Sequence, residues 1–230
     1  MSGKRRGLTG RIIGWAVRLV LALVMVPVIL VPLYTVVRPV STLMAWNAVT
    51  GAGADRRWIA LDDMAPALVA AVLMREDARY CSHDGVDWDE MRKAMADDFS
   101  RGASTIPMQT IKNVFLWQSR SFVRKALELP LAMFADTIWG KRRTMEIYLN
   151  VAEWGPGIFG AEAAAQHHFG RSAADISEME AALLAVALPN PHLRDAGTPS
   201  PRHVSLARRA IEGARASGSY SRCLQASASV

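Results

Sequence analysis

Residues 61–77 read LDDMAPALVAAVLMRED, and this stretch sets the helical character of the chain. Met64, Leu68 and Val72 recur at every fourth residue, which predicts the apolar face of an α-helix. Glu76 continues the same series. A carboxylate on an apolar face is either hydrogen-bonded and structural or functional, and burial would raise its pKa towards the range that suits a general acid or base.

Most of the chain beyond this stretch is also predicted to be helical. Helical patterns begin near Trp88 and extend over residues 108–116, 122–139 and 142–150. The apolar side of residues 122–139 is predicted to consist of Leu127, Leu131, Phe134 and Ile138. Ser177 and Glu180 have the spacing of a capping box that opens a buried helix over residues 181–188. Because no long stretch alternates with period 2, the domain is predicted to be all-α.

The composition indicates one globular domain plus a membrane segment. The chain has 230 residues, of which 51% are hydrophobic and 21% charged, and its mean hydropathy is +0.11. The net charge of +6 favours a polyanionic or membrane-surface partner, and composition alone leaves nucleic acid and phosphate-bearing lipid both open. Cys81 and Cys223 lie far apart in the sequence, so we expect two free thiols rather than a disulfide framework or a metal cluster.

The N-terminal residues predict an uncleaved membrane anchor. Residues 1–11 form a basic tail, and residues 12–37 end in an uncharged run of 19 residues, Leu19 to Val37, which is long enough for one transmembrane helix. A cleaved signal peptide would have a shorter apolar region and a small-residue cleavage site, which residues 34–39 do not resemble. The basic flank predicts a single-pass protein of the bacterial inner membrane, with a cytoplasmic N-terminus and a periplasmic domain.

Breaker-rich stretches divide the remainder of the chain. Residues 38–57 are predicted to be a juxtamembrane connector, and residues 58–200 to be the globular domain. The domain is expected to end among four prolines, Pro189, Pro191, Pro199 and Pro201. Residues 201–230 are predicted to be a basic C-terminal segment that is partly disordered.

Residues 75–87 read REDARYCSHDGVD and resemble the first signature of the glycosyltransferase domain of peptidoglycan synthases. That signature has Glu-Asp, two residues, an aromatic residue, two residues, His, one residue and Gly. Tyr80 stands where the family usually has Phe. Asp77, His83 and Asp87 are also candidate metal ligands, but their spacing matches no metal motif, which favours a structural turn.

Residues 102–113 read GASTIPMQTIKN and resemble the second signature, Gly-Gly-Ser-Thr-Ile-x-Gln-Gln-x-x-Lys-Asn. Ala103, Pro107 and Met108 depart from that signature. The residues that match it, and that the resemblance implies as substrate-binding, are Ser104, Thr105, Gln109, Lys112 and Asn113. Taken alone, a Ser-Thr pair before a helix would be a structural cap, although a helix N-terminus can also receive phosphate oxygens.

Residues 120–128 read RSFVRKALE and resemble the family's Arg-Lys-x-x-Glu segment. Glu128 falls where the family has its second acidic residue, which implies a catalytic role. The resemblance also implies a cationic clamp for a pyrophosphate, made of Lys112, Arg120, Arg124 and Lys125. The alternative is an ordinary solvated basic face. A fourth match, MEIYLN at residues 145–150, continues to residue 191 and is interpreted mainly as scaffold.

Four motifs in series, spread over roughly residues 58–200, identify the chain as a member of the monofunctional biosynthetic peptidoglycan transglycosylases. The resemblance implies a lysozyme-like, all-α fold with a core lobe and a membrane-proximal jaw lobe. The implied substrates are the growing glycan strand and lipid II, a disaccharide-pentapeptide on undecaprenyl pyrophosphate. Glu76 would deprotonate the 4-hydroxyl of the acceptor, which attacks C1 of the donor with inversion, and Glu128 would support the leaving undecaprenyl pyrophosphate.

The resemblance also sets expectations for cofactors and partners. No cofactor is obligatory in this scheme; a divalent cation, Mg or Mn, is an optional addition at the pyrophosphate, and no metal ligands are assigned. Besides the membrane, other cell-wall synthesis or division proteins are candidate partners. Nucleic acid is not expected, because the basic residues form no recognisable reader motif.

Two other functions remain as alternatives. A pair of carboxylates near a sugar also suits a lytic transglycosylase or a lysozyme-like hydrolase, although a hydrolase needs neither a pyrophosphate clamp nor a lipid-proximal anchor. A membrane scaffold of the division machinery would be indifferent to Glu76. None of the five lysines has Ser three residues before it, the spacing that a penicillin-binding domain uses, so uncross-linked glycan strands are the expected product.

Overall fold

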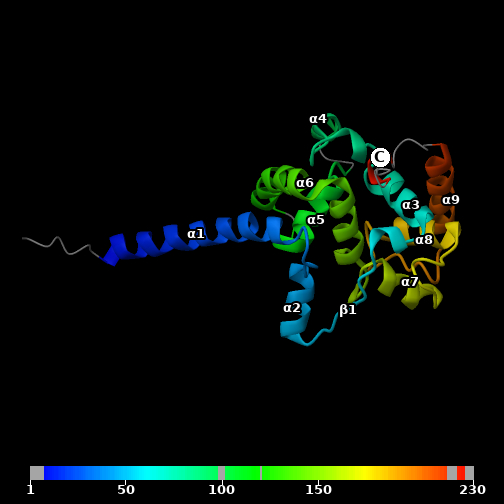
Figure 1. The fold of residues 1–230 in the computed structure, drawn as a ribbon, viewed down its shortest axis with the longest axis horizontal. Helices are drawn as coiled ribbons and strands as arrows, with labels where there is room; N and C mark the ends of the chain where they lie inside the picture. The colour runs from blue at the N-terminus through cyan, green and yellow to red at the C-terminus, as the bar shows by residue number, and fades with distance from the viewer. Residues whose placement is uncertain (1–7, 98–101, 120, 217–221, 226–230) are drawn as a thin grey trace, which may run out of the picture.

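The computed structural model describes residues 8–97, 102–119, 121–216 and 222–225. α1 (Leu8–Leu33) projects away from the other helices, and its C-terminal end packs against them (Figure 1). Its Gly10–Leu33 stretch is long and apolar enough to cross a membrane. The predicted anchor, residues 12–37, is therefore helical as far as Leu33, and residues 34–37 form a turn that follows the helix.

The remaining helices make up almost all of the domain. They are α2 (Thr42–Thr50), α3 (Pro66–Glu76), α4 (Trp88–Ala96), α5 (Ile106–Phe115), α6 (Phe122–Val151), α7 (Ala161–Phe169), α8 (Glu178–Ala187) and α9 (Pro201–Ala216). Short 3₁₀ turns lie at Leu61–Asp63, Tyr80–Ser82 and Arg222–Leu224. The all-α prediction is confirmed, and the helix expected near Trp88 is α4.

A small sheet accompanies the helices. Its strand order is β1-β3-β2, with β1 (Asp55–Arg56) parallel to β3 (Ile158–Phe159) and β2 (Glu153–Gly155) antiparallel to β3. Strands of two or three residues cannot produce a readable alternation of apolar and polar positions, so the sequence pattern did not predict them. The sheet ties the predicted connector, which contains α2 and β1, to the region that follows α6.

Buried apolar residues form two clusters, as the expected core and jaw lobes require. The larger cluster joins α3, α7, α8 and α9, and α8 is its buried centre. Ser177 and Glu180 make both hydrogen bonds of the predicted capping box at the start of α8. The smaller cluster lies between α5 and the first half of α6, and Val31 at the end of α1 belongs to it.

The predicted apolar side of α6 is wrong at both of its ends. Leu127 and Ile138 are each 41% exposed, whereas Ala132, Ala135 and Trp139 are buried. The physical reason is that the buried side of α6 is the one that packs with α5 and with Val31 of α1 in the smaller cluster, and this packing between segments is not encoded in the apolar period of the helix itself. The helices expected at residues 122–139 and 142–150 merge into α6 across a break at residue 140.

α9 is part of the main core rather than a basic appendage. Ala207 and Ala210 on its inner face are buried against α3 and α8. Arg215, on its outer face, pairs with Glu178 at the start of α8. The compact core therefore continues past the prolines at which we expected it to end.

Cys81 and Cys223 form a disulfide, with their Cα atoms 5.6 Å apart, so the expectation of two free thiols is wrong. The two residues are 142 positions apart, and only the folded chain brings them together. Leu224 is buried in the main core, and its carbonyl oxygen accepts a hydrogen bond from Arg142 of α6. The disulfide thus fastens the C-terminal turn to the segment that follows α3, and the hydrogen bond from Arg142 fastens it to α6.

Replacing both cysteines by Ser is expected to lower the free energy of unfolding by about 2–4 kcal/mol, because an open chain gains conformational entropy when it unfolds. Thermal denaturation should show a lower Tm for the double variant, and a dithiol reductant should lower the Tm of the wild type to a similar value. The reductant should leave the double variant unchanged. Equal melting of oxidised and fully reduced wild type would contradict this role for the disulfide.

Candidate active site

Glu76 is the last residue of α3, where the predicted apolar face ends. Leu68 and Val72 of that face are fully buried, which confirms the helical pattern. Glu76 Oε2 accepts a hydrogen bond from Gln109 Nε2 at 2.9 Å, while Oε1 is buried and has no hydrogen-bond partner among the described residues. One carboxylate oxygen is therefore held by Gln109, and the other, although buried, makes no hydrogen bond within the described residues that a substrate hydroxyl would have to displace.

The surroundings of Glu76 raise its pKa above the ordinary value. Burial is the largest cause, because it disfavours the charged form. The hydrogen bond from Gln109 and the positive charges of Arg75 and Lys112 oppose this effect without reversing it. A carboxylate with a raised pKa is a stronger base than one in water, which suits proton abstraction.

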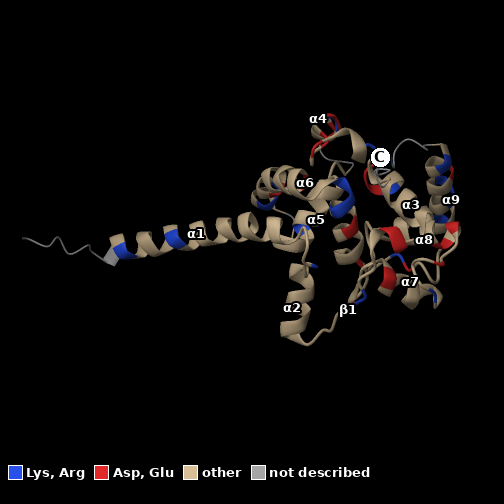
Figure 2. Ribbon diagram, in the orientation of Figure 1, with Lys and Arg blue, Asp and Glu red and all other residues tan. Residues whose placement is uncertain are grey.

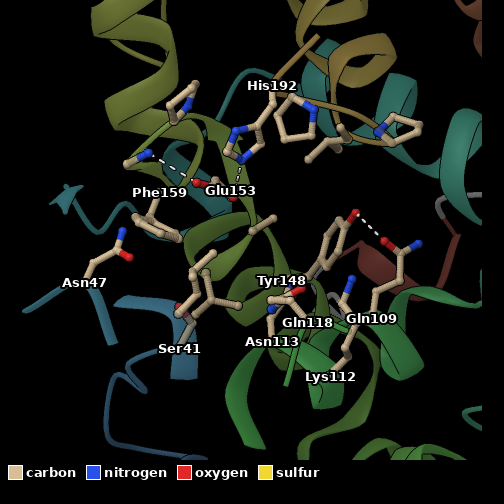
Figure 3. A pocket seen from close by; sticks show the side chains of 18 of the residues that line it. Ser41, Asn47, Gln109, Lys112, Asn113, Gln118, Tyr148, Glu153, Phe159 and His192 are labelled. Atoms are coloured by element: carbon tan, nitrogen blue, oxygen red, sulfur yellow. Dashed lines mark hydrogen bonds and ion pairs between the residues drawn. The ribbon is translucent and has the colours of Figure 1, made fainter. Parts of the chain in front are cut away.

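Tyr148 of α6 sets the orientation of Gln109. Its hydroxyl donates to Gln109 Oε1 at 3.2 Å (Figure 3), which leaves the amide nitrogen of Gln109 to donate to Glu76. Tyr148 is fully buried. Its motif was interpreted mainly as scaffold, and no sequence signal reveals the contact with Gln109, since the contact depends on how α5 and α6 are aligned.

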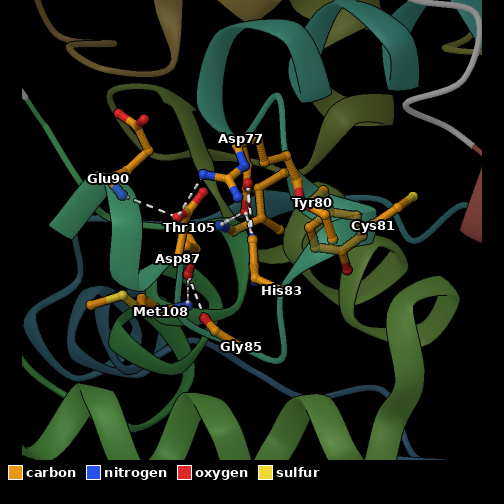
Figure 4. Close-up of polar contacts among 12 residues, drawn as sticks. Asp77, Tyr80, Cys81, His83, Gly85, Asp87, Glu90, Thr105 and Met108 are labelled. Atoms are coloured by element: carbon orange, nitrogen blue, oxygen red, sulfur yellow. Dashed lines mark hydrogen bonds and ion pairs between the residues drawn. The ribbon is translucent and has the colours of Figure 1, made fainter. Parts of the chain in front are cut away.

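The first-signature turn is held by hydrogen bonds within the protein (Figure 4). Asp77 Oδ2 accepts from the backbone N–H of Ile106 at 2.9 Å, and Asp77 Oδ1 lies 3.0 Å from His83 Nε2. Asp87 caps α4 by accepting from two backbone N–H groups. These contacts confirm the structural-turn interpretation. Among the described residues, no group of three or more His, Cys, Asp or Glu is arranged to hold a metal ion.

The turn of the first signature requires glycine at position 85. Its φ is +81°, and a Cβ atom there would lie 2.7 Å from the backbone oxygen of Ala132. The carbonyl oxygen of Gly85 accepts a hydrogen bond from the buried Thr105 hydroxyl at 2.6 Å. The first signature is therefore fixed both to α6 and to the second signature.

The second-signature loop ends at Thr105, which caps α5 by accepting from the Met108 N–H. Pro107 lies in the first turn, where helix geometry requires no hydrogen-bonded N–H. The Met108 side chain is fully buried in the smaller apolar cluster. The fold thus accommodates Pro107 and Met108, two of the three departures from the family signature. Thr105 lines the smaller hollow and its hydroxyl bonds to the carbonyl oxygen of Gly85, while Ser104 and Gln109 contact the charged residues Lys125 and Glu76.

Three described cations gather beyond Glu76, on α5 and the start of α6. Lys125 Nζ donates to Ser104 Oγ at 2.8 Å and to Glu128 Oε2 at 3.0 Å. Arg124 pairs with the other oxygen of Glu128, which is only 2% exposed. Lys112 completes the group and is close enough to Arg124 and Lys125 for mutual repulsion. Arg120, the fourth predicted member, lies outside the described residues.

Burial and mutual repulsion weaken the proton affinity of these cations. The pKa of Lys125 falls to about 8, chiefly because of burial and also because Arg124 and Lys112 are positively charged neighbours. Burial likewise lowers the pKa of Lys112. Such a cluster of positive charge in a partly buried site is arranged to bind a polyanion.

Two hollows flank the Glu76–Gln109 pair. A cleft of about 650 Å³ is lined by Gln109, Lys112 and Tyr148, together with parts of α2 and the β2–β3 region (Figure 3). A second hollow of about 270 Å³ is lined by Glu76 itself and by Ser104. Asn113 also lines the larger cleft. Glu76 lines the smaller hollow and its hydrogen-bond partner Gln109 lines the larger cleft, so this pair connects the two.

The larger cleft contains residues that no sequence motif marked as substrate-binding. Asn47 of α2 lies on one side, and Glu153 and His192 lie on another, joined by a contact of 3.1 Å between Glu153 Oε2 and His192 Nε2. They come from three distant segments, and none of them belongs to a motif that indicated substrate binding. Only the folded structure places them beside Gln109 and Lys112.

Comparisons with known proteins agree with the geometry. The family model described as Transglycosylase matches residues 44–212. A biosynthetic peptidoglycan transglycosylase of Agrobacterium fabrum is 55% identical over 210 residues, which cover 89% of this chain and 93% of that protein. Proteins of the same name from Rhizobium meliloti and Brucella suis biovar 1 are 55% identical over 212 residues and 48% identical over 222 residues. The match to the Rhizobium meliloti protein covers 90% of this chain and 90% of that protein. The match to the Brucella suis protein covers 94% of this chain and 99% of that protein.

Proposed function

The chain belongs to the transglycosylase family, and from this premise we propose that it joins lipid II units into β-1,4-linked strands and releases undecaprenyl pyrophosphate. It is a glycosyltransferase that polymerises the glycan strands of peptidoglycan in cell wall synthesis. The observation that carries the substrate assignment is the position of Glu76. Its buried, unpartnered oxygen lies at a hollow beside a partly buried cationic cluster.

Glu76 acts as the general base in the proposed reaction. Its carboxylate accepts the proton of the acceptor's 4-hydroxyl group, and the oxygen attacks C1 of the donor sugar. The bond between C1 and the pyrophosphate oxygen breaks, its electron pair leaves with the pyrophosphate, and the configuration at C1 inverts. Gln109 holds Oε2 of Glu76, so Oε1 is the atom that receives the proton.

Lys112, Arg124 and Lys125 are proposed to bind the donor pyrophosphate and to stabilise the negative charge that builds up as it leaves. Glu128 fixes Arg124 and Lys125 in place through its two oxygens. Because both oxygens already face cations, the buried Glu128 does not fit the role of a metal ligand. We therefore propose that no cofactor is obligatory and that the basic cluster, rather than Mg or Mn, supplies the positive charge.

A sugar hydrolase is the alternative, and the same cluster argues against it. Hydrolysis of a glycosidic bond needs two carboxylates and water, and has no anionic leaving group for these cations to stabilise. Glu128 is also unavailable as a free carboxylate, because it is buried between Arg124 and Lys125. The contacts of Glu128 therefore favour transfer from a pyrophosphate donor.

We propose that α1 is the uncleaved, single-pass anchor, with a cytoplasmic N-terminus and the catalytic domain in the periplasm. The apolar Gly10–Leu33 stretch and the preceding basic residues support this orientation. The disulfide between Cys81 and Cys223 also supports it, since such bonds persist in oxidising compartments. Growing strands and the membrane are the proposed partners, and other cell-wall synthesis or division proteins are further candidates.

The test uses full-length protein in detergent and fluorescently labelled lipid II. We expect long glycan strands that a muramidase digests entirely to monomeric muropeptides. Cross-linked dimers, or labelling of this chain by a fluorescent penicillin, would contradict an activity limited to glycan polymerisation. Cleavage of preformed strands without lipid II consumption would instead establish the hydrolase.

Tyr148→Phe is expected to slow polymerisation by up to about tenfold, because one neutral hydrogen bond contributes roughly 0.5–1.5 kcal/mol. Without the hydroxyl, the Gln109 amide loses the contact that directs its nitrogen at Glu76. The hydrogen bond from Gln109 lowers the pKa of Glu76, so weakening that bond should raise this pKa. The acid limb of the pH–rate profile should therefore move to higher pH. The profile of kcat on lipid II checks both effects, and an unshifted limb would assign Tyr148 a packing role alone.

The alkaline limb of the same profile is expected to reflect Lys125. Its pKa of about 8 means that the cationic form, which binds pyrophosphate, is lost as the pH rises through that value. Activity should therefore fall above about pH 8. In Lys125→Arg the limb should move to higher pH, because guanidinium remains charged. An identical limb in wild type and Lys125→Arg would show that another group titrates there.

A further inference from the structure

The end of α3 that carries Glu76 is bracketed by the C-terminal part of the chain. Gly213 of α9 packs against Met74, two residues before Glu76, so closely that a Cβ atom at position 213 would lie 2.9 Å from Met74 Cγ. Five residues after Glu76, Cys81 forms the disulfide with Cys223. The proposed base thus lies between two contacts that α9 and the C-terminal turn make with the same segment.

The two sides of α9 differ in chemistry. Exposed arginines lie along the length of the helix (Figure 2). The other side presents small residues to α3, since Ala207 and Ala210 are buried and Gly213 continues the series at every third position. Met74 lines the smaller hollow together with Glu76, so the contact with Gly213 lies next to the candidate active site.

The C-terminal turn, Arg222–Leu224, reaches the segments on both sides of α3. Leu224 is buried in the main core, its carbonyl oxygen accepts a hydrogen bond from Arg142, and the Cys223 N–H donates to the sulfur of its disulfide partner at 3.3 Å. Arg142 in turn pairs with Asp62, in the turn before α3. A turn of three residues with one buried side chain is a small unit, which opens locally at little cost once its covalent link is broken.

The inner side of the turn that carries Cys81 faces α5 and α6. Asp77 accepts a hydrogen bond from the backbone of α5, and the Tyr80 hydroxyl donates to the carbonyl oxygen of Lys141 in α6 at 2.7 Å. Figure 4 shows Cys81 pointing away from Asp77 and His83. The turn is therefore held by hydrogen bonds on its inner side and by the disulfide on its outer side, and the disulfide is the contact that responds to redox state.

We propose that the disulfide between Cys81 and Cys223 positions Glu76 for proton abstraction, so that the oxidised protein polymerises glycan faster than the reduced one. Reduction by a dithiol breaks the S–S bond, leaves two thiols on this chain and converts the dithiol to a disulfide. The C-terminal turn can then leave the core, and the end of α3 loses its outer support. This inference rests on the proposed function of Glu76 as the general base.

The two cysteines act through Glu76 and do not touch the substrate. Both are partly exposed, so a dithiol can reach the bond between them. Neither cysteine lines either of the two hollows that the described residues form beside Glu76 and Gln109. Loss of the disulfide is therefore expected to change the chemical step, while the cations that bind the donor stay in place.

The pKa of Glu76 gives a readout that a merely structural disulfide would not move. The charged and titratable groups that act on Glu76 are Arg75 and Asp77 beside it, Lys112 of α5 and Tyr148 of α6. Burial is nevertheless the largest cause of the raised pKa of Glu76. When the end of α3 loosens, water reaches the carboxylate and its pKa falls towards the ordinary value. The acid limb of the pH–rate profile should then move to lower pH, opposite to the shift expected for Tyr148→Phe.

The experiment compares oxidised and reduced full-length protein in detergent on labelled lipid II. Cys81→Ser/Cys223→Ser is assayed beside the wild type, with and without a dithiol, at a temperature at which circular dichroism shows both proteins folded. We expect reduction to lower kcat of the wild type about tenfold, since a misplacement of about 1 Å can cost up to about 10²-fold, and to leave KM for lipid II unchanged. The double variant should match the reduced wild type and ignore the dithiol, and reoxidation with glutathione disulfide should restore kcat of the wild type.

Ile176→Ala is the control for a general loss of stability. Ile176 is buried in the main core and lines neither of the two hollows in the described part of the chain, and its truncation costs stability comparable to the loss of a disulfide. At the same temperature this variant should polymerise like the wild type. Equal kcat of the oxidised and reduced wild type would overturn the proposal. An equal loss of kcat in Ile176→Ala, or a rise in KM with kcat unchanged, would also contradict it.

Hydrogen–deuterium exchange tests the position of the segment without an enzymatic assay. The backbone N–H groups of Asp77, Tyr80 and Ser82 donate to carbonyl oxygens of the same segment at 2.9, 3.0 and 2.8 Å. They should exchange several-fold faster in the reduced wild type, whereas the amides of α8 should keep their rates. Unchanged exchange over residues 77–82 would overturn the proposal even if reduction slowed polymerisation. An oxidised wild type that fails to polymerise would sink the proposed function, and the exchange result would still decide whether the disulfide holds the end of α3.

Discussion

Replacing Glu76 by Gln is expected to reduce glycan polymerisation by about 10²–10⁴-fold, the usual contribution of a positioned general base. Gln has nearly the same shape, and its side-chain oxygen can still accept the hydrogen bond from Gln109 that Glu76 Oε2 accepts. The variant lacks only a basic oxygen at the position of Oε1. Single-turnover assays with labelled lipid II measure this loss on the chemical step, apart from any change in binding.

The Glu76→Gln variant should be at least as stable as the wild type. Burial raises the pKa of Glu76, so the folded state holds the proton more tightly than the unfolded state does. The contribution of this group to stability therefore falls as the pH rises from the unfolded pKa to the folded pKa, and at neutral pH the ionised carboxylate destabilises the fold. A neutral Gln removes that penalty. The expected result is an equal or higher Tm at pH 7.

Glu90→Gln is the matched control for the Glu76 variant. Glu90 lines the same hollow, but it pairs with Lys93 on the exposed side of α4. Its substitution removes one negative charge near the site and leaves the proposed base intact. Polymerisation should stay within a few-fold of the wild type. If the two variants were equally active, the assignment of Glu76 as the base would be wrong.

Local sequence patterns predicted the elements that local physics decides. The Leu68 and Val72 series identified α3, and the Ser177–Glu180 spacing identified the start of α8, because helix periodicity and capping act within a few residues. The wrong side of α6 has a different origin. Leu127 and Ile138 are apolar but exposed, because the buried side of α6 is set by packing against α5 and the end of α1, which are distant in the sequence.

Contacts between distant segments could not be predicted from spacing. The disulfide joins residues 142 positions apart, and the Tyr148–Gln109 hydrogen bond spans two helices. Family motifs singled out residues that the fold brings together, since Gln109 bonds to Glu76 and Glu128 pairs with the cations at the start of α6, while their roles in the reaction stay predictions. The motifs carried no information on orientation, such as which oxygen of Glu76 remains free.

Replacing Glu128 by Gln is expected to lower kcat/KM for lipid II by about 10²-fold, the effect that a misplacement of about 1 Å can have on a reacting group. Glu128 is buried and holds Arg124 and Lys125 together against their mutual repulsion. A neutral Gln cannot balance two cations, so the clamp should lose its geometry before any substrate binds. The loss should appear mainly in the use of the pyrophosphate-bearing donor.

The same substitution should also destabilise the fold by about 3–5 kcal/mol, since it leaves buried charges without their partner. Asp136→Asn provides the control for loss of a buried, paired carboxylate. Asp136 lies on the same helix and pairs with Lys141 at 2.6 Å in a similarly buried position, but it contacts none of the proposed clamp residues in the described part of the chain. Glu128→Gln should show a lower Tm than the wild type, and of the two variants it alone should lose activity at a temperature at which both remain folded. Equal activity of the two folded variants would show that the pyrophosphate is bound elsewhere, and would separate Glu128 from the reaction.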